Sequence, residues 1–363
     1  MDYWLAGWKY RLKLTVDSGD ISDILSNFPV LIYISAASGI GNVDVSCVFD
    51  ELVADANRKK IAVTTSDGNT ECYVEIEKWD DGNEQAWLWV KIPSVASGTD
   101  TDLYLYYGID HADNNTYVGD TNDVVAENVW DANFMAVYHM ADGIDNAHIY
   151  DSTSNDNDGT KTGANQPVES TDLIGDSQTF DGTDRINCGN AATFNITDAV
   201  TIEARVKPST VTECGILAKD SYNDTFALYA RAAAGEMVGF RVESTGAGTL
   251  KAGNLVAATR YTLVGRYDKD GGADNVKIFA DGAEIGSRTQ TDVIPTNADD
   301  LYIGFVASTT NWWKGIIDEI RVSDIARTEA WIAASHESYI DDLITFGVEV
   351  RITCPRWDFF TWA

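Results

Sequence analysis

The segment KGIIDEIRVSD, residues 314–324, has the alternating pattern of a β-strand. Successive side chains of a strand point to opposite faces of its sheet. Ile316, Ile320 and Val322 therefore share one face. Asp318 lies on that same face, and a buried carboxylate needs hydrogen-bond donors or a cation. The segment predicts a core strand in which Asp318 points towards the core side.

The same alternation recurs along most of the chain. Apolar residues occupy every second position in KYRLKLTV (9–16) and FPVLIYIS (28–35), and AWLWVKIP (86–93) and DLYLYYG (102–108) are rich in aromatic and branched residues. Clusters of Gly, Asp, Asn and Ser separate these segments, as is typical of antiparallel sheets. One amphipathic segment, 326–339, predicts a short helix. We therefore predict an all-β protein of two antiparallel β-sandwich domains with a short C-terminal helix and a tail.

The length of 363 residues suits two domains better than one typical core. A polar, turn-rich segment at 108–123 separates two sets of strand patterns. We place the first domain at 1–127, the second at 128–348 and a tail at 349–363. The tail holds four aromatic residues, and exposed aromatic side chains are costly. It either packs back on its own domain or docks on a partner.

The chain is strongly acidic, with a formal net charge of -31. Such a surface repels nucleic acid and anionic membranes, and no stretch approaches the ~20 apolar residues of a membrane span. We predict neither a nucleic-acid partner nor membrane insertion. The acidity serves solubility alone or suits a saline environment. The start, MDYWLAGWKYRLKLTVD, lacks the pattern of a cleaved export signal, an expectation that fails if a signal was removed.

Cysteine and histidine spacing carries little information. The five cysteines include no CxxC pair, and the four histidines show no metal-ligand spacing. We predict neither a zinc motif nor a disulfide scaffold, and the pairing of any single bridge stays open.

The segment DSTSNDNDGT, residues 151–160, is polar and rich in carboxylates. Calcium binds six to eight oxygen atoms from carboxylates, carbonyls and water. The spacing does not fit an EF-hand loop, so a calcium site would combine this loop with a distant carboxylate such as Asp318. In the alternative interpretation, the polar side chains of the loop only stabilise a turn, and Asp318 accepts hydrogen bonds from backbone N–H groups.

Two adjacent tryptophans, Trp312 and Trp313, follow a polar turn in STTNWWKG (308–315). Neighbouring strand residues face opposite ways, so one ring can pack inward while the other is exposed. An exposed indole suits stacking on a sugar ring or on a partner protein. We predict Trp312 and Trp313 as carbohydrate-binding residues; in the alternative both rings serve packing.

Glu75 and Glu77 form a carboxylate pair in ECYVEIEKWD (71–80). Glycosidases use such pairs. Both glutamates lie opposite Val74 and Ile76, however, on what we expect to be the solvated side of the strand. The chain also lacks a credible catalytic triad, P-loop or dinucleotide fingerprint. We predict that the protein is not an enzyme.

Two ordered sets of motifs resemble known domains. WKYRLKLTVD, NFPVLIYIS, CYVEIEKWD, AWLWVKIPS and DLYLYYG resemble a domain of uncharacterised function from prokaryotic and phage surface proteins. VYHMADG, DSTSNDNDGT, SQTFDGTDRINCG, VTIEARVKPS, DNVKIFADGAEIGS and WWKGIIDEIRVSDIART resemble a concanavalin A-like, laminin-G-type jelly roll. This second resemblance implies carbohydrate binding or adhesion, and a structural calcium near Asp151, Asp158 and Asp318. The E-x-D-x-x-E strand of related glucanases is missing, which disfavours hydrolysis.

These observations lead to a functional hypothesis. We expect a non-enzymatic virion surface protein, a capsid decoration or tail-fibre component of a tailed phage, made in the host cytoplasm. Its partners would be other virion proteins and host or environmental polysaccharide, and a homo-oligomer fits the symmetry of particles. The alternatives are a cellular adhesin at the cell surface, a glycoside hydrolase, or a purely architectural part.

Overall fold

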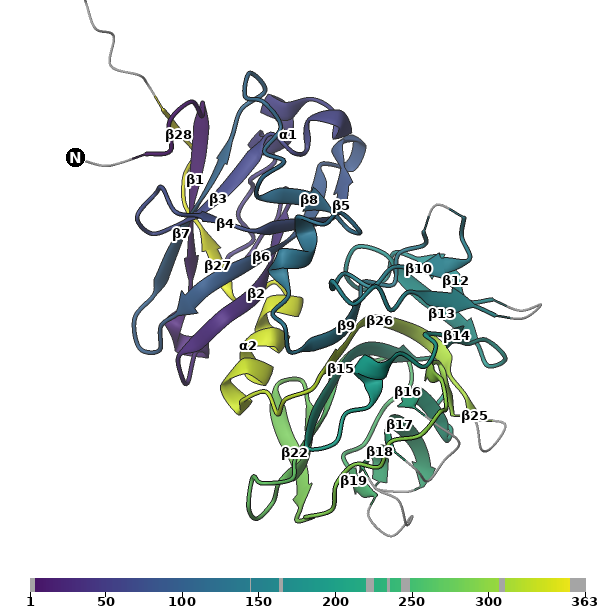
Figure 1. Cartoon of the computed structure of the whole chain (residues 1–363). Helices are drawn as coiled ribbons and strands as arrows, with labels where there is room; N and C mark the ends of the chain where they lie inside the picture. Colours follow the sequence, from purple (N-terminus) through teal and green to yellow (C-terminus); the bar gives the residue numbers. More distant parts are fainter. Residues whose placement is uncertain are drawn as a thin grey trace, which may run out of the picture.

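The computed structural model describes residues 4–143, 145–162, 166–219, 225–233, 236–242, 249–306 and 311–352. They form two β-sandwiches, one above the other in Figure 1, and each has its own hydrophobic core. Almost all strand pairs are antiparallel; β5 (Val74–Asp80) and β8 (Val118–Asp120) pair in parallel. The predicted all-β fold of two sandwiches with a short C-terminal helix is confirmed.

The N-terminal sandwich combines a six-stranded and a four-stranded sheet. Its remaining strands are β1 (Tyr10–Val16), β2 (Leu25–Ile34), β3 (Ile61–Thr65), β4 (Glu71–Cys72), β6 (Gln85–Val95), β7 (Thr101–Tyr107), β27 (Ile344–Phe346) and β28 (Val350–Arg351). The larger sheet has the order β27-β1-β7-β3-β4 with β28 beside β1, and the smaller has the order β2-β6-β5-β8. The smaller sheet supplies the surface that meets the second sandwich.

The C-terminal sandwich combines two eight-stranded sheets. One contains β10 (His148–Ile149), β11 (Gly159–Lys161), β14 (Ile186–Asn187), β23 (Leu301–Ile303), β16 (Cys214–Lys219), β17 (Phe226–Ala233), β18 (Glu236–Val242) and β19 (Leu250–Ala252), in that order. The other contains β12 (Val168–Ser170), β13 (Ser177–Asp181), β26 (Lys314–Ser323), β15 (Ala199–Pro208), β20 (Tyr261–Asp268), β21 (Val276–Ala280) and β22 (Ala283–Arg288), with β9 (Phe134–Tyr138) paired to β26. A separate pair joins β24 (Phe305–Val306) to β25 (Asn311–Trp312).

The helical elements are short. The described chain has two α-helices and five 3-10 turns: α1 (Cys47–Leu52), α2 (Glu329–Tyr339), η1 (Ser18–Asp20), η2 (Asp55–Asn57), η3 (Asp81–Asn83), η4 (Ala126–Val129) and η5 (Ala192–Phe194). The predicted helix at 326–339 corresponds to α2, where the Thr328 hydroxyl caps the N-terminus by accepting the Trp331 N–H at 3.1 Å. Among the described helices, none is long and apolar enough to cross a bilayer.

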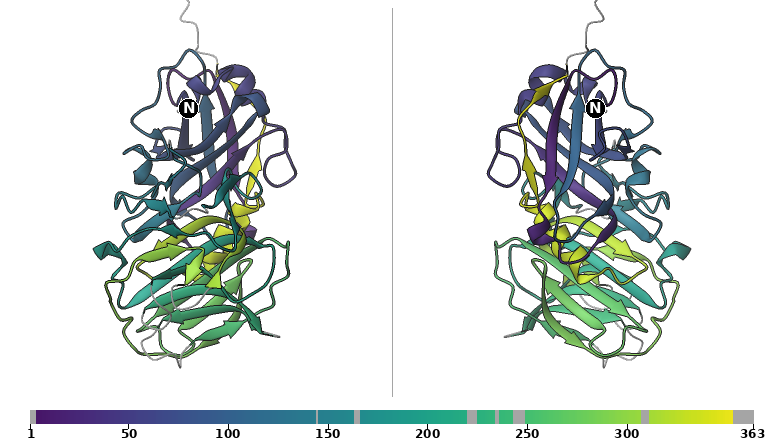
Figure 2. Two further views of the ribbon diagram at one scale, coloured as in Figure 1. Left: turned by 90° about the vertical axis from the view of Figure 1, so that its right-hand side faces the viewer. Right: turned by 90° about the vertical axis from the view of Figure 1, so that its left-hand side faces the viewer.

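The C-terminal segment returns to the N-terminal sandwich (Figure 2). Strand β27 pairs with β1, with Phe346 opposite Leu14, and both side chains are buried in the N-terminal core. The predicted second domain ends at 348, but the structure pairs β27 with β1 of the first sandwich. Helix α2 packs between the two sandwiches: Trp331 is buried in the N-terminal core, whereas Ile332 packs against Val264 and Phe279 of the second sandwich. Strand β28 shows that the start of the predicted tail also packs on this sandwich, whereas residues 353–363 lie outside the described residues.

Strand β9 links the two cores. Phe134 and Val137 belong to the N-terminal core cluster, whereas Ala136 and Tyr138 belong to the C-terminal one. Because one strand serves both clusters, the boundary between the sandwiches is a packed interface. This interface contains the first candidate site.

Candidate functional site

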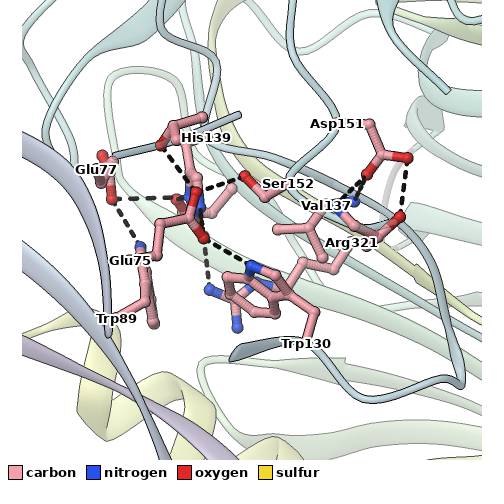
Figure 3. Close-up of polar contacts among 12 residues, drawn as sticks. Glu75, Glu77, Trp89, Trp130, Val137, His139, Asp151, Ser152 and Arg321 are labelled. Atoms are coloured by element: carbon pink, nitrogen blue, oxygen red, sulfur yellow. Dashed lines mark hydrogen bonds and ion pairs between the residues drawn. The ribbon is translucent and has the colours of Figure 1, made fainter. Parts of the chain in front are cut away.

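The main polar feature of the interface is a cluster of buried charged side chains, which we call the interface cluster: Glu75, Glu77, His139, Glu319 and Arg321. Figure 3 labels Glu75, Glu77, His139 and Arg321 of this cluster. The side chain of Glu77 is 1% exposed and that of Glu75 is 0% exposed. The prediction that both glutamates face solvent was wrong. Strand alternation correctly put them opposite Val74 and Ile76, but the second sandwich covers that face.

Two β-bulges direct carboxylates into the cluster. In β5 the register shifts between Ile76 and Lys78, so Glu77 is the extra residue. In β26 the register shifts opposite the pair Glu203/Arg205, where Glu319 adopts a φ of 46°. Bulges re-aim side chains, and a positive φ is strained for a glutamate. Both bulged residues are therefore held in place by the surrounding packing.

The bulge in β26 also changes the faces predicted for this strand. Ile317 lies in the C-terminal core together with Ile320 and Val322, so the core face switches parity at the bulge. Asp318 consequently does not share a face with Ile320. It is buried, but its carboxylate accepts the backbone N–H of Ile174, a residue of the N-terminal core cluster, at 2.8 Å.

Glu75 holds three parts of the chain together. Its Oε1 accepts the hydroxyls of Thr121 at 2.8 Å and Ser152 at 2.7 Å, and its Oε2 accepts the indole N–H of Trp130 at 2.6 Å. Thr121 follows β8, Trp130 lies in the connection, and Ser152 belongs to the acidic loop of the second sandwich. Hydrogen bonds to a buried carboxylate are strong, so Glu75 stabilises the domain arrangement.

His139, directly after β9, lies between three carboxylates. Its Nδ1 is 2.5 Å from Glu319 Oε1 and 3.7 Å from Glu77 Oε2, and its Nε2 is 3.4 Å from Glu75 Oε2. Burial opposes protonation of the imidazole, but the carboxylates of Glu319, Glu75 and Glu77 outweigh it and raise the pKa of His139 well above 6.5. The three carboxylates therefore favour the protonated form of the ring.

Glu77 is incompletely satisfied. Its Oε2 accepts the Trp89 indole N–H at 2.8 Å, but within the described chain its Oε1 has no hydrogen-bond partner. Burial raises its pKa to about 8, although the nearby His139 opposes this shift. Gly175, with a φ of +47°, covers the carboxylate so closely that a Cβ there would lie 1.9 Å from Oε1. A side chain at position 175 would displace Glu77.

Arg321 neutralises the cluster from the other side. Its Nη2 donates to Glu319 Oε2 at 2.6 Å, and its guanidinium lies 4.3–4.9 Å from the ring centroids of Trp89, Trp130 and Tyr339. Burial raises the pKa of Glu319, but the charges of His139 and Arg321 lower it by more. The pKa of Glu319 therefore lies below 4.5. Glu319 is thus an anion between two cations.

A cleft of about 530 Å³ opens beside the cluster. Glu77 and His139 line it, together with residues of both sandwiches. Both basic residues of its lining are ion-paired: Arg58 contacts Asp120 at 2.6 Å and Lys78 contacts Asp176 at 2.6 Å. Glu75 is 0% exposed and does not line the cleft, so a polymer has no access to it.

The predicted calcium ligands are engaged in other contacts. Asp151 accepts N–H groups of Val137, Thr153 and Asn157 at 2.9–3.0 Å, and burial raises its pKa to about 7. Asp158 is exposed, and its Oδ1 accepts the backbone N–H of Asp151 at 2.9 Å.

Asp318 accepts two backbone N–H groups, those of Ile174 and Glu319. Within the described chain, Asp151, Asp158 and Asp318 do not gather into a group of metal-ligand spacing. Calcium binding at these residues stays a prediction. The hydrogen bonds of Asp151 and Asp318 agree with the alternative, in which these carboxylates accept backbone N–H groups and bind no ion.

The two adjacent tryptophans separate as strand alternation requires. Trp313 is 0% exposed and belongs to the C-terminal core, so its ring cannot stack on a ligand in this structure. Trp312 is partly exposed, and its ring centroid lies 4.3 Å from that of Phe305. The Arg185 guanidinium faces Tyr302, Phe305 and Trp312 at 4.9, 5.1 and 5.8 Å; we call these four residues the aromatic patch.

A polar groove of about 510 Å³ adjoins the aromatic patch. We call it the outer groove, and it is lined by Asp156, Asn157, Asp158, Thr160, Thr162, Asn187, Cys188, Gly189, Asn190 and Ala191. Two hydrogen bonds connect it to the patch: Arg185 Nε donates to Thr162 Oγ1 at 3.2 Å, and Asn187 Nδ2 donates at 2.9 Å to Asp300, which also accepts the Tyr302 hydroxyl. Part of the acidic loop thus lines a surface groove with an aromatic rim.

With this geometry established, comparison with known families is informative. Residues 180–333 match the concanavalin A-like lectin/glucanases superfamily, and residues 57–147 match a domain of unknown function (DUF2341). The chain carries a concanavalin A-like domain. The domain of unknown function precedes it, as the ordered motifs indicated. The first match includes Glu319 and Arg321 and the second includes Glu75, Glu77 and His139, so the interface cluster draws on both domains.

Solved structures are similar to this chain at low identity. Domain 4 of the extracellular arabinanase AbnA from Geobacillus stearothermophilus, determined with arabinotriose, is 22% identical with a TM-score of 0.44, covering 56% of this chain and 98% of that domain. The binding domain of Paraclostridial Mosquitocidal Protein 1 is 10% identical with a TM-score of 0.45, covering 57% of this chain and 52% of that chain.

The ligand-binding domain of Botulinum neurotoxin serotype D, determined with N-acetylneuraminic acid, is 10% identical with a TM-score of 0.44, covering 57% of this chain and 51% of that one. This chain thus spans about half the length of the toxin structures. No curated protein sequence matches the chain. The resemblance to these structures is too distant to transfer a ligand.

Sequence reasoning missed three members of the interface cluster: His139, Glu319 and Arg321. A signal was present, because VYHM and IIDEIRV place charged residues inside otherwise apolar strands. Charged residues buried in this way are normally paired. Their partners come from both sandwiches, so they can be identified only when it is known which sheet faces of the two sandwiches pack together.

Proposed function

We propose that this protein is a non-enzymatic surface protein that binds neutral glycans through the outer groove and the aromatic patch of its concanavalin A-like domain. The observation that carries the proposal is the continuity of the two features, through Arg185 and Thr162 and through Asn187 and Asp300. Sugar recognition needs an apolar face for the ring and polar groups for its hydroxyls. Here Trp312 supplies the face, and the groove supplies hydroxyl, amide and carboxylate groups.

The charge of the groove favours uncharged glycans. Asp156 and Asp158 are exposed along it, and the chain carries a formal net charge of -31. Both features repel carboxylated or sulfated sugars. Carboxylates accept hydrogen bonds from sugar hydroxyls and can also hold calcium, so the predicted structural calcium would act here on the same loop.

A non-enzymatic role is supported by the position of the glutamate pair. Glu75 and Glu77 are covered by the second sandwich, so a glycosidic bond cannot reach them. Binding without cleavage is the activity that this arrangement serves.

The virion surface is part of the same proposal. The outer face of the larger N-terminal sheet carries an aromatic group in which Trp8 stacks on His111 at 3.8 Å and Trp4 and Tyr104 are partly exposed. This face lies on the side of the molecule away from the concanavalin A-like domain (Figure 1). Attachment to other particle proteins through this face would leave the glycan site directed outward. A cellular adhesin attached in the same way is the alternative.

Glycan binding is tested with the purified full chain on immobilised neutral and acidic polysaccharides, in calcium and in chelator. We expect neutral polysaccharide to bind and Trp312→Ala to weaken binding about tenfold, a change of ~1.4 kcal/mol. Trp87→Ala, a partly buried tryptophan of the N-terminal sandwich, is the matched control and should bind normally. Equal binding of acidic polymers, or no effect of Trp312→Ala, would refute the assignment of this groove.

The location is tested separately by mass spectrometry of purified virus particles from a culture that makes this protein. We expect the chain in stoichiometric amount with particle proteins, and antibody labelling at the particle surface. Recovery in the cell-envelope fraction instead would favour the adhesin.

A further inference from the structure

We propose that the interface cluster binds one divalent transition-metal ion of the zinc class through Glu77, His139 and Glu319. One ligand atom from each residue lies within 4.8 Å of the other two. The three side chains are 0–1% exposed. They come from β5, from the residue after β9 and from β26, so the ion would join the two domains.

An unpartnered atom points to a ligand. In the described structure, Glu77 Oε1 is buried without a hydrogen-bond partner. Buried polar atoms are nearly always satisfied in folded proteins, and each exception needs a partner that is not yet accounted for. A cation beside Glu77 supplies that partner for the carboxylate.

The groups around the three ligands match the outer shell of a metal site. Trp89 donates to Glu77 Oε2 and Arg321 donates to Glu319 Oε2, so each carboxylate is oriented through one oxygen. His139 directs Nδ1 towards the two ligand carboxylates and Nε2 towards Glu75 Oε2, at 3.4 Å. A metal-bound histidine commonly donates its second N–H to a carboxylate in this way.

Charge balance agrees with a divalent ion. Glu75, Glu77 and Glu319 carry three negative charges when ionised, and Arg321 carries one positive charge. A divalent ion with neutral His139 would offset these charges, and buried Asp318 and Glu203 close by add to the negative potential that attracts a cation. The imidazole nitrogen favours zinc, iron or nickel over calcium and magnesium, which prefer oxygen ligands alone.

Binding demands one local movement. His139 Nδ1 and Glu319 Oε1 are 2.5 Å apart, whereas two ligands of a tetrahedral zinc ion, each at ~2.0–2.1 Å, are about 3.3 Å apart. Glu319 would therefore shift by about 1 Å from the imidazole. The cleft beside Glu77 and His139 provides an entry path and space for a water molecule as fourth ligand.

The test uses the full chain, stripped with a chelator and titrated with zinc by calorimetry, followed by elemental analysis after gel filtration. We expect one tightly bound zinc per chain. The nearly isosteric Glu77→Gln should weaken this binding at least ~100-fold, and Glu84→Gln, an exposed carboxylate of the same domain, should leave it unchanged. Circular dichroism confirms that each variant is folded.

Cobalt substitution provides a second readout. Tetrahedral cobalt should absorb in the visible range and quench the fluorescence of Trp89, whose ring lies 5.6 Å from that of His139. Absence of stoichiometric zinc would overturn the proposal. So would zinc retained at equal affinity in Glu77→Gln or displaced by equimolar calcium, because both results mean adsorption to the acidic surface. Glycan binding is independent of either result.

Discussion

The interface cluster and the outer groove use the same residue types in opposite environments. Glu75 is fully buried and accepts three hydrogen bonds from three parts of the chain, whereas Asp156 and Asp158 are exposed beside a groove. Electrostatic interactions strengthen as water is excluded, and the cost of an unpaired charge rises with them. Carboxylates of the cluster therefore contribute to stability and domain arrangement, whereas those of the groove face solvent and are accessible to a ligand.

The largest expected effect is that of Arg321→Met. The substitution keeps apolar volume but leaves Glu319 buried without its guanidinium partner. We expect a loss of about 3–5 kcal/mol in the free energy of unfolding, measured by urea denaturation. Arg260→Met is the control, because Arg260 is 54% exposed and its pair with Asp172 should contribute less than about 1 kcal/mol. Equal losses in the two variants would contradict the role of burial.

The adjacent tryptophans give a second contrast. Trp313 fills the C-terminal core, so Trp313→Ala should destabilise the protein by about 3–5 kcal/mol. Trp312→Ala should cost about 1 kcal/mol or less, because its ring is partly exposed. Thermal and urea unfolding of both variants measure the difference. A Trp312 variant as unstable as the Trp313 variant would remove the basis for a binding role of the patch.

The pH dependence of stability tests the environment of Glu77. The pKa of Glu77 is about 8 in the folded protein, whereas the ordinary value for a glutamate is 4.5. Between these two pH values the folded state therefore binds one proton more than the unfolded state. The stabilisation contributed by protonated Glu77 is fully present below about pH 4.5 and is lost as the pH rises through 8. In chelator, the wild type should therefore lose stability relative to Glu77→Gln over this window. Parallel curves for the two proteins would show that the carboxylate is solvated.

The smallest expected effect comes from two serines of one loop. Ser152 donates to buried Glu75, so Ser152→Ala should cost about 1.5–3 kcal/mol. Ser154 is exposed, and Ser154→Ala should change stability by about 0.5 kcal/mol or less. Urea denaturation of the pair measures how far the loop contributes to the interface. A neutral Ser152→Ala would mean that Glu75 finds water in place of the hydroxyl.

Much of the architecture followed from local patterns. The alternation in KYRLKLTV and FPVLIYIS predicts β1 and β2, and the opposite environments of Trp312 and Trp313 follow from the same rule. Local patterns do not reveal the bulges in β5 and β26. A bulge inserts one residue, so the residues that follow it point to the opposite face from the one that simple alternation predicts. Alternation therefore placed Asp318 on the same face as Ile320, whereas the structure places these residues on different faces.

The all-β class, the two domains, their order and the residues available for each face follow from the sequence, because side-chain period and turn composition are local properties. Which face is covered depends on how the two sandwiches pack. Glu75 and Glu77 became buried because β9, β26 and the acidic loop close over β5, and β27 joined β1 across more than three hundred residues. Such contacts depend on surfaces that are distant along the chain, and no local pattern encodes which of these surfaces will meet.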